Sequence, residues 1–451
     1  MAKYKAYPEY KDSGVEWLGD IPGHWKTISI SRLFSRIKRT GYTEKELLSV
    51  YRDYGVIPKS SRDDNNNKPS EDLSPYQLVQ PNDLVMNKMK AWQGSIAISE
   101  YEGIVSPAYF VYQPNNSLFE LAHPKYVHYL LRNPIYVTQY LSRSKGIRVN
   151  QWDLDPDEFR NIELLLPSKV EQEKIYNFLD HETAKIDKLI EKQQQLIELL
   201  KEKRQAVISH AVTKGLNPDV PMKDSGVEWL GEIPSHWEMK RLAYLGSARN
   251  GLTYSPENIT DQESGTLVLR SSNIRNSSLC FDDNVYVNSS IPEQFLVKEN
   301  DLLICSRNGS RNLIGKNALI SKDAAGMAFG AFMAIFRSQI NTYIFWVLNS
   351  PLFDYQSGSF LTSTINQLTI GNLNSMKVPV PTFKEQKEIV HYLSKKNNDF
   401  IELINKVNNS IALLQERRTA LISAAVTGKI DVRDWIASDM QDAEEPQETT
   451  A

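Results

Sequence analysis

The amino-acid sequence predicts a mixed α/β (α+β) fold with two pseudo-twofold-related globular domains, separated by two long helices that form an antiparallel coiled coil. Three observations support this fold class. Most recognisable segments occur twice, one repeated block has the apolar spacing of a coiled coil, and the segments between the repeats contain strand-like alternation of apolar and polar residues.

The duplication covers most of the chain. Residues 11–25 return at residues 223–237 with changes only at Asp20/Glu232 and Gly23/Ser235. A second block, residues 167–213, returns at residues 381–427 without a gap, and the two shifts along the chain are almost equal. Equivalent parts therefore follow in the same order, which is typical of a protein with an approximate internal twofold axis. Duplex DNA, which also has two related halves, is the first candidate partner for such a protein.

The bulk composition limits the class of protein. A chain of 451 residues exceeds a single ordinary core, so two globular units with connecting helices are expected. No apolar run approaches the roughly 20 residues of a membrane-spanning helix, and residues 1–5 lack the apolar stretch of a secretory signal. Cys280 and Cys305 are too few and too isolated for a disulfide framework or a cysteine-based zinc site. We therefore expect a cytoplasmic protein.

The net charge of −3 is weak evidence against DNA binding, because nucleic-acid-binding domains are usually basic. The charge is distributed unevenly, however. A Pro/Gln/Thr-rich tail, residues 429–451, is expected to be disordered. Its last residues carry five acidic side chains, Asp439, Asp442, Glu444, Glu445 and Glu448. Basic stretches at residues 32–39 and 143–148 remain available for local contacts with DNA.

The second repeated block predicts the two long helices, residues 167–215 and 381–428. Each begins after a proline and ends at a glycine, as helices commonly do. A helix of this length measures about 65 Å and cannot bury its own apolar stripe, so the two copies are expected to pair. Polar seam positions such as Gln193 and Lys203 would tune the register or leave room for partner proteins. The predicted seam consists of Ile175, Leu179, Ile186, Leu189, Leu196, Leu200, Val207 and Ala211 in the first copy and Ile389, Leu393, Phe400, Leu403, Val407, Leu414, Leu421 and Ala425 in the second.

The globular domains are predicted at residues 1–166 and 216–380. They share a skeleton despite little sequence identity: strands at residues 82–85 and 300–303, then longer alternating strands at residues 104–111 and 327–335. A helix-like stretch follows in each half, at residues 126–131 and 343–348, and is broken by Pro134 or Pro351.

The loops of this skeleton contain side chains suited to DNA. Arg, Lys, Asn and Gln can make paired hydrogen bonds to base edges, while Ser, Lys and Arg also hold phosphates. Any one such residue is more often part of a solvated polar loop, but the clusters together favour DNA contact. The candidates are Lys88, Lys90, Trp92, Gln93, Arg143, Lys145, Arg148 and Asn150 in the first half and Arg307, Asn308, Ser310, Arg311, Asn312 and Asn366 in the second.

No pattern predicts catalysis. The segment from Asn133 to Tyr136 is similar to the Asn-Pro-Pro-Tyr tetrad of adenine methyltransferases, but it lacks the second proline and no glycine loop for S-adenosylmethionine precedes it. Residues 309–316 have the wrong spacing for a phosphate-binding loop. His24 and His236 have no second ligand at metal spacing, so a hydrogen-bonded structural role is favoured. The sequence indicates a binding protein with no metal and no cofactor in this chain.

The repeated composite resembles the DNA-specificity (S) subunit of Type I restriction-modification enzymes. The matching features are the repeated segment at residues 11–25 and the long helices, which contain Glu171-Gln172 and Glu385-Gln386 near their starts. The resemblance covers almost everything before the acidic tail. It implies two target-recognition domains that each read one half of a bipartite DNA sequence from the major groove, while the paired helices act as a spacer that sets the unread gap.

The same resemblance implies partners and cofactors. The helices would dock two modification (methyltransferase) subunits, which bring S-adenosylmethionine and methylate adenine. Restriction subunits would add ATP-driven translocation and cleavage, so ATP and Mg would also reside on the partners. The chain itself would be a non-catalytic subunit of a host-defence system.

Two alternatives remain open at this point. A coiled-coil scaffold could join two protein partners and bind peptides with its globular ends, without direct DNA readout. A self-contained methyltransferase is disfavoured by the missing cofactor loop.

Overall fold

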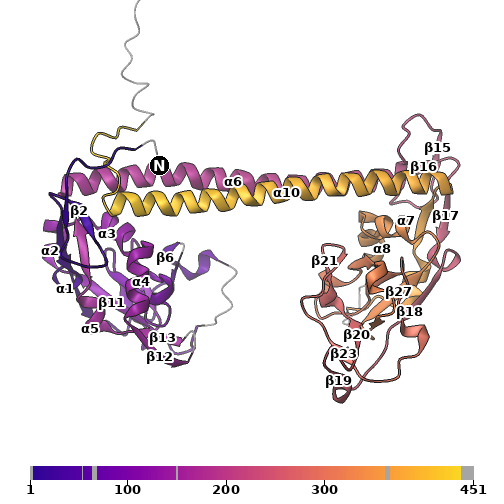
Figure 1. The fold of residues 1–451 in the computed structure, drawn as a ribbon, viewed down its shortest axis with the longest axis horizontal. Coiled ribbons are helices and arrows are strands. Elements are labelled where there is room, and N and C mark those ends of the chain that lie inside the picture. The colour runs from indigo at the N-terminus through magenta and orange to yellow at the C-terminus, as the bar shows by residue number, and fades with distance from the viewer. Residues whose placement is uncertain (1–3, 53, 63–68, 149–150, 361–365, 438–451) are drawn as a thin grey trace, which may run out of the picture. The chain divides into compact units, whose positions relative to one another are not determined.

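The structure, a computed structural model, describes residues 4–52, 54–62, 69–148, 151–360 and 366–437. It divides into two compact units, of which unit 1 comprises Met1–Gln193 with Asn409–Ala451 and unit 2 comprises Gln194–Asn408. Each unit contains one globular domain and part of each long helix (Figure 1). The division between units therefore falls within the helices.

The first half of the chain ends in the first long helix. Its elements are β1 (Tyr10–Asp12), β2 (Asp20–Pro22), β3 (Lys26–Ser29), α1 (Ile30–Leu33), β4 (Phe34–Ile37), β5 (Leu48–Tyr51), β6 (Gly55–Pro58), β7 (Gln77–Val79), β8 (Leu84–Asn87), β9 (Ile96–Ile98), β10 (Gly103–Val105), β11 (Tyr109–Pro114), α2 (Asn116–Leu121), α3 (Pro124–Leu131), α4 (Pro134–Ser142), β12 (Ser144–Arg148), β13 (Gln151–Leu154), α5 (Pro156–Arg160), β14 (Glu163–Leu166) and α6 (Lys169–Lys214).

The second half repeats this plan with more short strands. Its elements are β15 (Met222–Asp224), β16 (Glu232–Pro234), β17 (Glu238–Arg241), β18 (Ser247–Asn250), β19 (Ile259–Thr260), β20 (Thr266–Leu269), β21 (Ile274–Arg275), β22 (Ser278–Leu279), β23 (Tyr286–Val287), β24 (Leu302–Cys305), β25 (Asn317–Leu319), β26 (Ala328–Phe329), β27 (Met333–Arg337), α7 (Asn341–Leu348), α8 (Pro351–Phe360), α9 (Ile370–Ser375), β28 (Lys377–Val380) and α10 (Phe383–Val426).

Both units are built around the same antiparallel four-stranded sheet. The strand order is β4-β11-β8-β9 in unit 1 and β18-β27-β24-β25 in unit 2. A second pair, β3 with β14 and β17 with β28, also recurs, and in each unit it ends directly before a long helix. The predicted mixed α+β fold with a repeated scaffold is therefore confirmed.

The repeated Asn-Asp pair shapes the entrance to the third strand of each sheet. Asn82 and Asn300 have φ values of 71° and 65°, a backbone region that asparagine tolerates better than most residues. The aspartate that follows each is buried and forms an ion pair with an arginine, Asp83 with Arg39 and Asp301 with Arg337. The sequence similarity at these positions thus reflects a structural requirement of the sheet.

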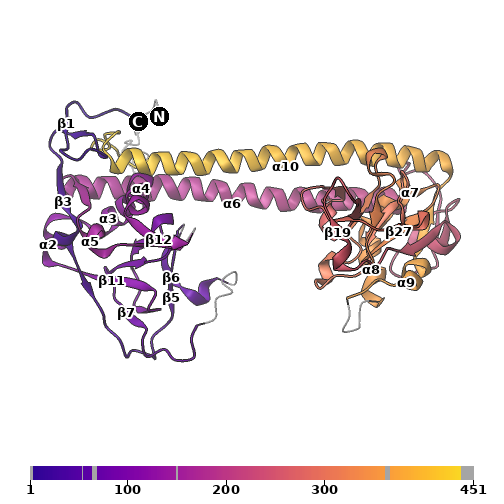
Figure 2. The same cartoon turned by 60° about the horizontal axis from the view of Figure 1, so that its bottom comes forward.

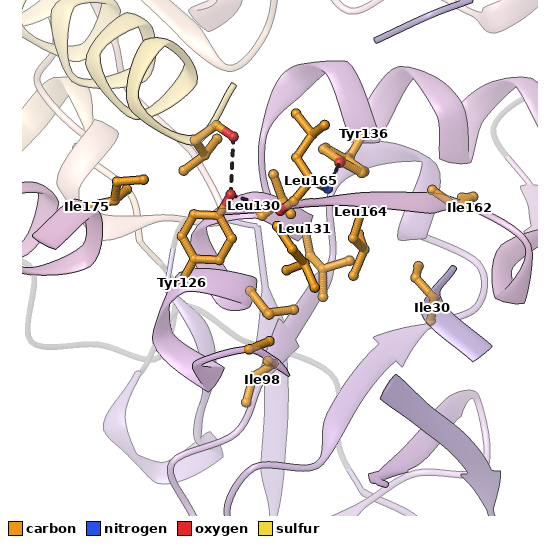
Figure 3. Packing of buried hydrophobic residues seen from close by; sticks show 14 of the residues in the cluster. Ile30, Ile98, Tyr126, Leu130, Leu131, Tyr136, Ile162, Leu164, Leu165 and Ile175 are labelled. Atoms are coloured by element: carbon orange, nitrogen blue, oxygen red, sulfur yellow. Dashed lines mark hydrogen bonds between the residues drawn. The ribbon is translucent and has the colours of Figure 1, made fainter. Parts of the chain in front are cut away.

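Helices α3 and α4 lie between the long helices and the sheet of unit 1 (Figure 2). The hydroxyl of Tyr126 in α3 donates to the carbonyl of Leu165 at 2.9 Å, and the hydroxyl of Tyr136 in α4 accepts from the amide of Leu165 at 3.2 Å (Figure 3). In unit 2, Tyr343 of α7 likewise donates to the carbonyl of Pro379 at 2.9 Å. These buried tyrosines join the strand before each long helix to the domain core.

Two predicted strands are wrong in extent. Residues 104–111 form the separate strands β10 and β11, because Pro107 lies between them and lacks the amide hydrogen that a central strand needs. Residues 327–335 also divide, into β26 and β27, around a turn in which Met333 donates its amide to the carbonyl of Gly330 at 2.8 Å. The predicted helices at residues 126–131 and 343–348 lie within α3 and α7. Pro134 and Pro351 begin the next helices, where proline is well tolerated.

The long helices α6 and α10 pair in opposite directions within each unit. In unit 1, the Arg418 guanidinium contacts both carboxylate oxygens of Asp187, at 2.8 and 3.2 Å, and Ile175 shares a core with Leu421 and Ala425. In unit 2, Arg204 donates to the side-chain oxygen of Asn397 at 2.7 Å, and Ile208 shares a core with Ile389. Both helices end before a glycine of positive φ, as predicted for Gly215 and Gly428.

Three leucines of the predicted seam are displaced by one residue, whereas Leu200 and Val407 are half-buried as predicted. Leu189, Leu196 and Leu403 are exposed by 47%, 40% and 46%, whereas the following residue, an isoleucine in each case, is half-buried. Lys203 is exposed and Arg204 is half-buried in its place, while Gln193 is half-buried as expected of a seam position. The sequence offers two adjacent apolar residues at each leucine site, and a helix of 3.6 residues per turn drifts relative to a strict seven-residue repeat.

Part of the predicted disordered tail is packed. Ile430 and Val432 are 3% and 1% exposed, and the Trp435 ring lies 5.4 Å from the Phe178 ring of α6. The amide of Asp431 donates to the carbonyl of Lys5 at 2.8 Å. The expectation of disorder is thus wrong for residues 429–437, whose alternating apolar side chains complete the core of unit 1. Residues 438–451 lie outside the described residues.

Candidate nucleic-acid interface

The repeated segment at residues 11–25 forms a hairpin that connects each domain to its helix. Strands β1 and β2 pair antiparallel, and the Asp12 carboxylate accepts from the Gly14 amide at 2.9 Å in the turn that follows β1. Strands β15 and β16, with Asp224 and Gly226, repeat this geometry at the same distance. The segment therefore has a structural role in both units.

The tryptophan that ends each hairpin region shares a core with residues of both long helices. In unit 1, Trp25 donates its indole N–H to Glu171 at 3.0 Å, and His24 contacts the same carboxylate at 2.8 Å. A Cβ added at Gly428 would lie 2.5 Å from Pro22, so the end of α10 packs closely against the same hairpin. In unit 2, His236 and Trp237 contact Glu385. The two histidines thus have the structural role that the sequence favours.

The first basic cluster follows strand β8 in unit 1. The amide of Lys88 donates to the carbonyl of Ala108 at 3.2 Å, and residues 91–93 form a single 3-10 turn. Lys90 and Gln93 are exposed, whereas Trp92 is half-buried and its indole N–H donates to the carbonyl of Met89 at 3.0 Å. This loop presents Lys90 and the amide of Gln93 to solvent beside an aromatic ring, and Lys88 is half-buried.

The hairpin β12–β13 brings the second cluster of unit 1 to the same place. The Trp92 and Trp152 rings lie 4.9 Å apart, and the amide of Leu154 donates to the carbonyl of Lys88 at 3.2 Å. The structure therefore places together two clusters that are more than fifty residues apart in the sequence.

The residues of this second cluster differ in their availability. Arg143 ends α4, and its guanidinium donates to the backbone carbonyl of Gln139 at 3.2 Å, so it braces the helix. Lys145 is 74% exposed and pairs with Asp155 at 3.4 Å. Arg148 is the last residue of β12, and Asn150 lies outside the described residues.

Unit 2 presents its clusters at the equivalent position, after strand β24. Arg307 forms a β-bridge with Gln367, and the amide of Leu368 donates to the carbonyl of Ser306 at 2.7 Å. Two of the predicted base-reading amides brace the loop. Asn308 donates to Ser271 at 3.3 Å, and Asn366 donates to the carbonyl of Gly309 at 3.1 Å.

The remaining candidates of unit 2 face solvent. Ser310, Arg311 and Asn312 are exposed, and residues 311–313 form a short 3-10 turn. Arg307 is also exposed, and its guanidinium carbon lies 5.3 Å from the centre of the Phe332 ring. Guanidinium and amide groups are the side chains best suited to base edges, so this loop is the strongest candidate for base readout in unit 2.

Sequence reasoning missed two aromatic residues of these surfaces. Trp152 directly follows the basic cluster of residues 143–151, and this position in the sequence could have identified it as part of the same surface. Phe332 was hidden because residues 327–335 read as one strand, whereas it lies in the turn before β27 and is 60% exposed.

The described part of the chain holds no cluster of three or more metal-ligating side chains, and none of its helices is long and apolar enough to cross a membrane. Burial raises the pKa of the Cys305 thiol, which disfavours the nucleophilic thiolate. A cavity of about 560 Å³ in unit 1 is lined by residues such as Tyr54, His128 and Asp180. None of the candidate DNA-binding residues lines this cavity. The loop clusters, and not the cavity, are therefore the candidate functional site.

Comparison with known proteins gives the family. The sequence model of the Type I restriction modification DNA specificity domain matches residues 22–199 and 234–413. The chain is 22% identical over 444 residues to the Type I restriction enzyme EcoKI specificity subunit of Escherichia coli K12, with 93% of this chain and 92% of that protein covered. It is 25% identical over 433 residues to the MjaVIII specificity subunit of Methanocaldococcus jannaschii, with 92% and 95% covered.

A solved structure shows the same fold. It comes from a study of complex assembly and conformational transition in the type I R-M system, and it superimposes with a TM-score of 0.62 at 16% identity, covering 90% of this chain and 98% of that one. Because the family model matches both globular domains and most of both long helices, the chain belongs to the family of the Type I restriction modification DNA specificity domain and carries two copies of it.

Proposed function

We propose that this chain is the sequence-specific DNA-binding specificity subunit of a Type I restriction-modification complex, in which each globular domain reads one half of a bipartite target. The observation that carries the proposal is the contrast between scaffold and loops. The same four-stranded sheet recurs in both units, but the loop after its third strand differs in length and chemistry. A pair of readers for two different half-sites requires this combination.

The loop chemistry supports the proposal that the two units read different half-sites. The unit 1 loop offers Lys88, Lys90 and Gln93 beside two tryptophans, and the unit 2 loop offers Arg307, Arg311 and Asn312. Lysines suit phosphates and guanine, while arginine and asparagine suit guanine and adenine edges in the major groove. The half-sites are therefore expected to differ.

The long helices support the docking of partner proteins. Several of their large apolar side chains face solvent, and Leu199 and Leu413 are 60% and 65% exposed. We propose that two modification subunits carrying S-adenosylmethionine dock on α6 and α10, and that restriction subunits bring ATP and Mg. The complex would act in the cytoplasm. These exposed side chains also favour the alternative, a coiled-coil scaffold that does not read DNA.

Salt dependence of duplex binding separates the two functions. Neutralised phosphates release counterions, so a chain with several phosphate contacts should lose affinity by about a hundredfold or more between 50 and 200 mM salt. The measurement is fluorescence anisotropy of the full chain with its modification subunit on a labelled duplex. Replacing Lys88 and Lys90 with alanine should reduce the slope by roughly 2, whereas the exposed pair Lys11 and Lys223, on the hairpin strands β1 and β15, provides the control. An affinity that does not respond to salt would support the scaffold.

A further inference from the structure

Arg307 and Phe332 form an exposed pair at the candidate interface of unit 2. The guanidinium carbon lies 5.3 Å from the ring centre, and the phenyl ring is 60% exposed. The amides of Ser306 and Arg307 both donate to the carbonyl of Phe332, at 3.0 and 3.1 Å. The two residues are therefore held together by their backbones as well as by contact between the guanidinium and the ring.

The loop around Arg307 is braced from two further sides. The bridge to Gln367 fixes it from the segment before α9, and Asn308 fixes it through Ser271, which follows strand β20. A side chain on such a braced loop loses less conformational entropy on binding than one on a mobile loop. An aromatic face beneath a guanidinium also limits the directions in which its N–H groups can point.

The equivalent pair in unit 1 has different chemistry. There Lys88 donates its amide to the carbonyl of Ala108, as Ser306 donates to Phe332, so the strand pairing aligns Met89 with Arg307 and Ala108 with Phe332. Phosphate contacts need not differ between two half-sites, because the DNA backbone is the same for every sequence, whereas base contacts must differ. The shared scaffold carries Arg with Phe at this position in unit 2 and Met with Ala in unit 1, so the position is a candidate determinant of sequence.

We infer that Arg307 reads a guanine of the second half-site through paired hydrogen bonds to N7 and O6, and that Phe332 is a positioning residue that holds the guanidinium for this contact. The inference rests on the proposed function. An arginine fork matches the two acceptors of guanine, which is the commonest specific contact in the major groove. A lysine can also donate to guanine, but its ammonium group lacks the rigid planar fork and fixes this paired geometry less well.

Unit 1 supplies one matched variant for the test, because Phe332→Ala gives the residue found at the equivalent position, Ala108. Arg307→Lys keeps the charge and removes the planar fork, and Phe332→Tyr retains an aromatic face. Each full-length variant is co-expressed with the modification subunit in a methylation-free host, and methylated adenine is mapped across the genome. Both side chains are exposed, so thermal unfolding of the purified variants is expected to match that of the unaltered chain.

The variants are expected to change the methylated motif at a single base position. With Arg307→Lys, preference for one guanine in one half-site falls by about one to two orders of magnitude, while the other half-site and the gap are unchanged. Phe332→Ala produces a smaller loss at the same position, and Phe332→Tyr restores the preference. If Arg307→Lys reduces the preference for guanine at that position and Phe332→Ala does not, Phe332 is not a positioning residue.

Two other outcomes contradict the inference in different ways. If Arg307→Lys lowers methylation at all sites equally and the motif is unchanged, Arg307 contacts a phosphate and the guanine assignment is wrong. If the unaltered chain yields no bipartite motif, the proposed function fails together with this inference, and this result is recognisable without any variant.

Discussion

Glu171 and Glu385 occupy equivalent positions near the starts of the two long helices, but their surroundings differ. Glu171 is 4% exposed and accepts from the hydroxyl of Tyr7 at 2.7 Å in addition to its histidine and tryptophan partners. Glu385 is 28% exposed and takes Thr382 as its third partner, with the hydroxyl donating at 2.7 Å. The repeat thus preserves the carboxylate and two of its donors and replaces the third.

The environment of Glu385 leads to a pH-dependent contribution to stability. Burial would raise the pKa of its carboxyl, but hydrogen bonds from Thr382, His236 and Trp237 outweigh burial and lower the pKa to about 2. A carboxyl with a depressed pKa stabilises the fold above the unfolded-state pKa of about 4.5, and this contribution is lost as the pH falls toward 2.

Replacing Glu385 with glutamine should therefore destabilise the protein more at neutral pH than in acid. We expect the free energy of unfolding to fall by roughly 2 kcal/mol at pH 6 and by roughly half of that or less at pH 3, measured by urea unfolding. Glu388→Gln is the control on the same helix, because its side chain is 54% exposed. A constant difference between the Glu385 variant and the unaltered chain across this range would rule out the assigned pKa.

At the same scale, the sequence predicts which types of residue form the candidate interface but not which of them are used in contacts within the domain. Arg143 and Arg307 look equally suited to DNA in the sequence, yet Arg143 braces α4 and Arg307 faces solvent. Asn308 and Asn366 are used within the loop. These differences depend on contacts between segments far apart in the chain, which local sequence patterns do not encode.

The long helices show how far an apolar pattern predicts an element. The existence, direction and ends of α6 and α10 follow from spacing and from terminal prolines and glycines. The register of the middle section does not, because Leu196-Ile197 and Leu403-Ile404 each offer two adjacent apolar residues. Packing then selects the isoleucine in both cases.

Substitution of neighbouring residues tests this register. Ile197→Ala removes a half-buried seam side chain and should lower the free energy of unfolding by about 1–2 kcal/mol. Leu196→Ala removes a side chain that is 40% exposed and should change it by less than about 0.5 kcal/mol. Chemical denaturation of the two variants under identical conditions provides the measurement. The reverse order of effects would restore the seam predicted from the sequence.

Residues 429–437 form a second element, which contributes more to the core of unit 1 than its sequence predicts. Val432 is 1% exposed in the core of unit 1, whereas Ile436, four residues later, is 56% exposed. Val432→Asp buries an unpaired charge and should destabilise the protein by about 3 kcal/mol or more, while Ile436→Asp should have little effect. Differential scanning calorimetry can detect the change, and equal melting temperatures for the two variants would contradict the packed position of this segment.

For the whole molecule, the duplication in the sequence was sufficient to predict two related domains and two long helices. It did not give the different strand content of the two units, such as the sheet β19-β23-β20-β26 that occurs in unit 2. Strand pairing between segments distant in sequence depends on tertiary contacts, so short strands in divergent loops are poorly predicted by local patterns. The scaffold was predictable because both copies preserve it. The candidate interface was not predictable, because its loops differ between the two copies.

If the paired helices act as a spacer, their length sets the gap between the half-sites. Insertion of about four residues, close to one helical turn, in the region of residues 189–200, with a matching insertion in α10, should change the preferred gap. Both half-sites should stay the same, because the loops after β8 and β24 are untouched. Methylation mapping that shows an unchanged gap would remove the spacer role.

Each globular domain is proposed to read its own half of the target, and exchange of one domain tests this most directly. Residues 1–166 are replaced with the corresponding segment of another family member, and methylated adenine is mapped after co-expression with the modification subunit. We expect one half-site to change to that of the donor while the other half-site and the gap stay constant. A change in both half-sites, or in neither, would contradict independent reading by the two domains.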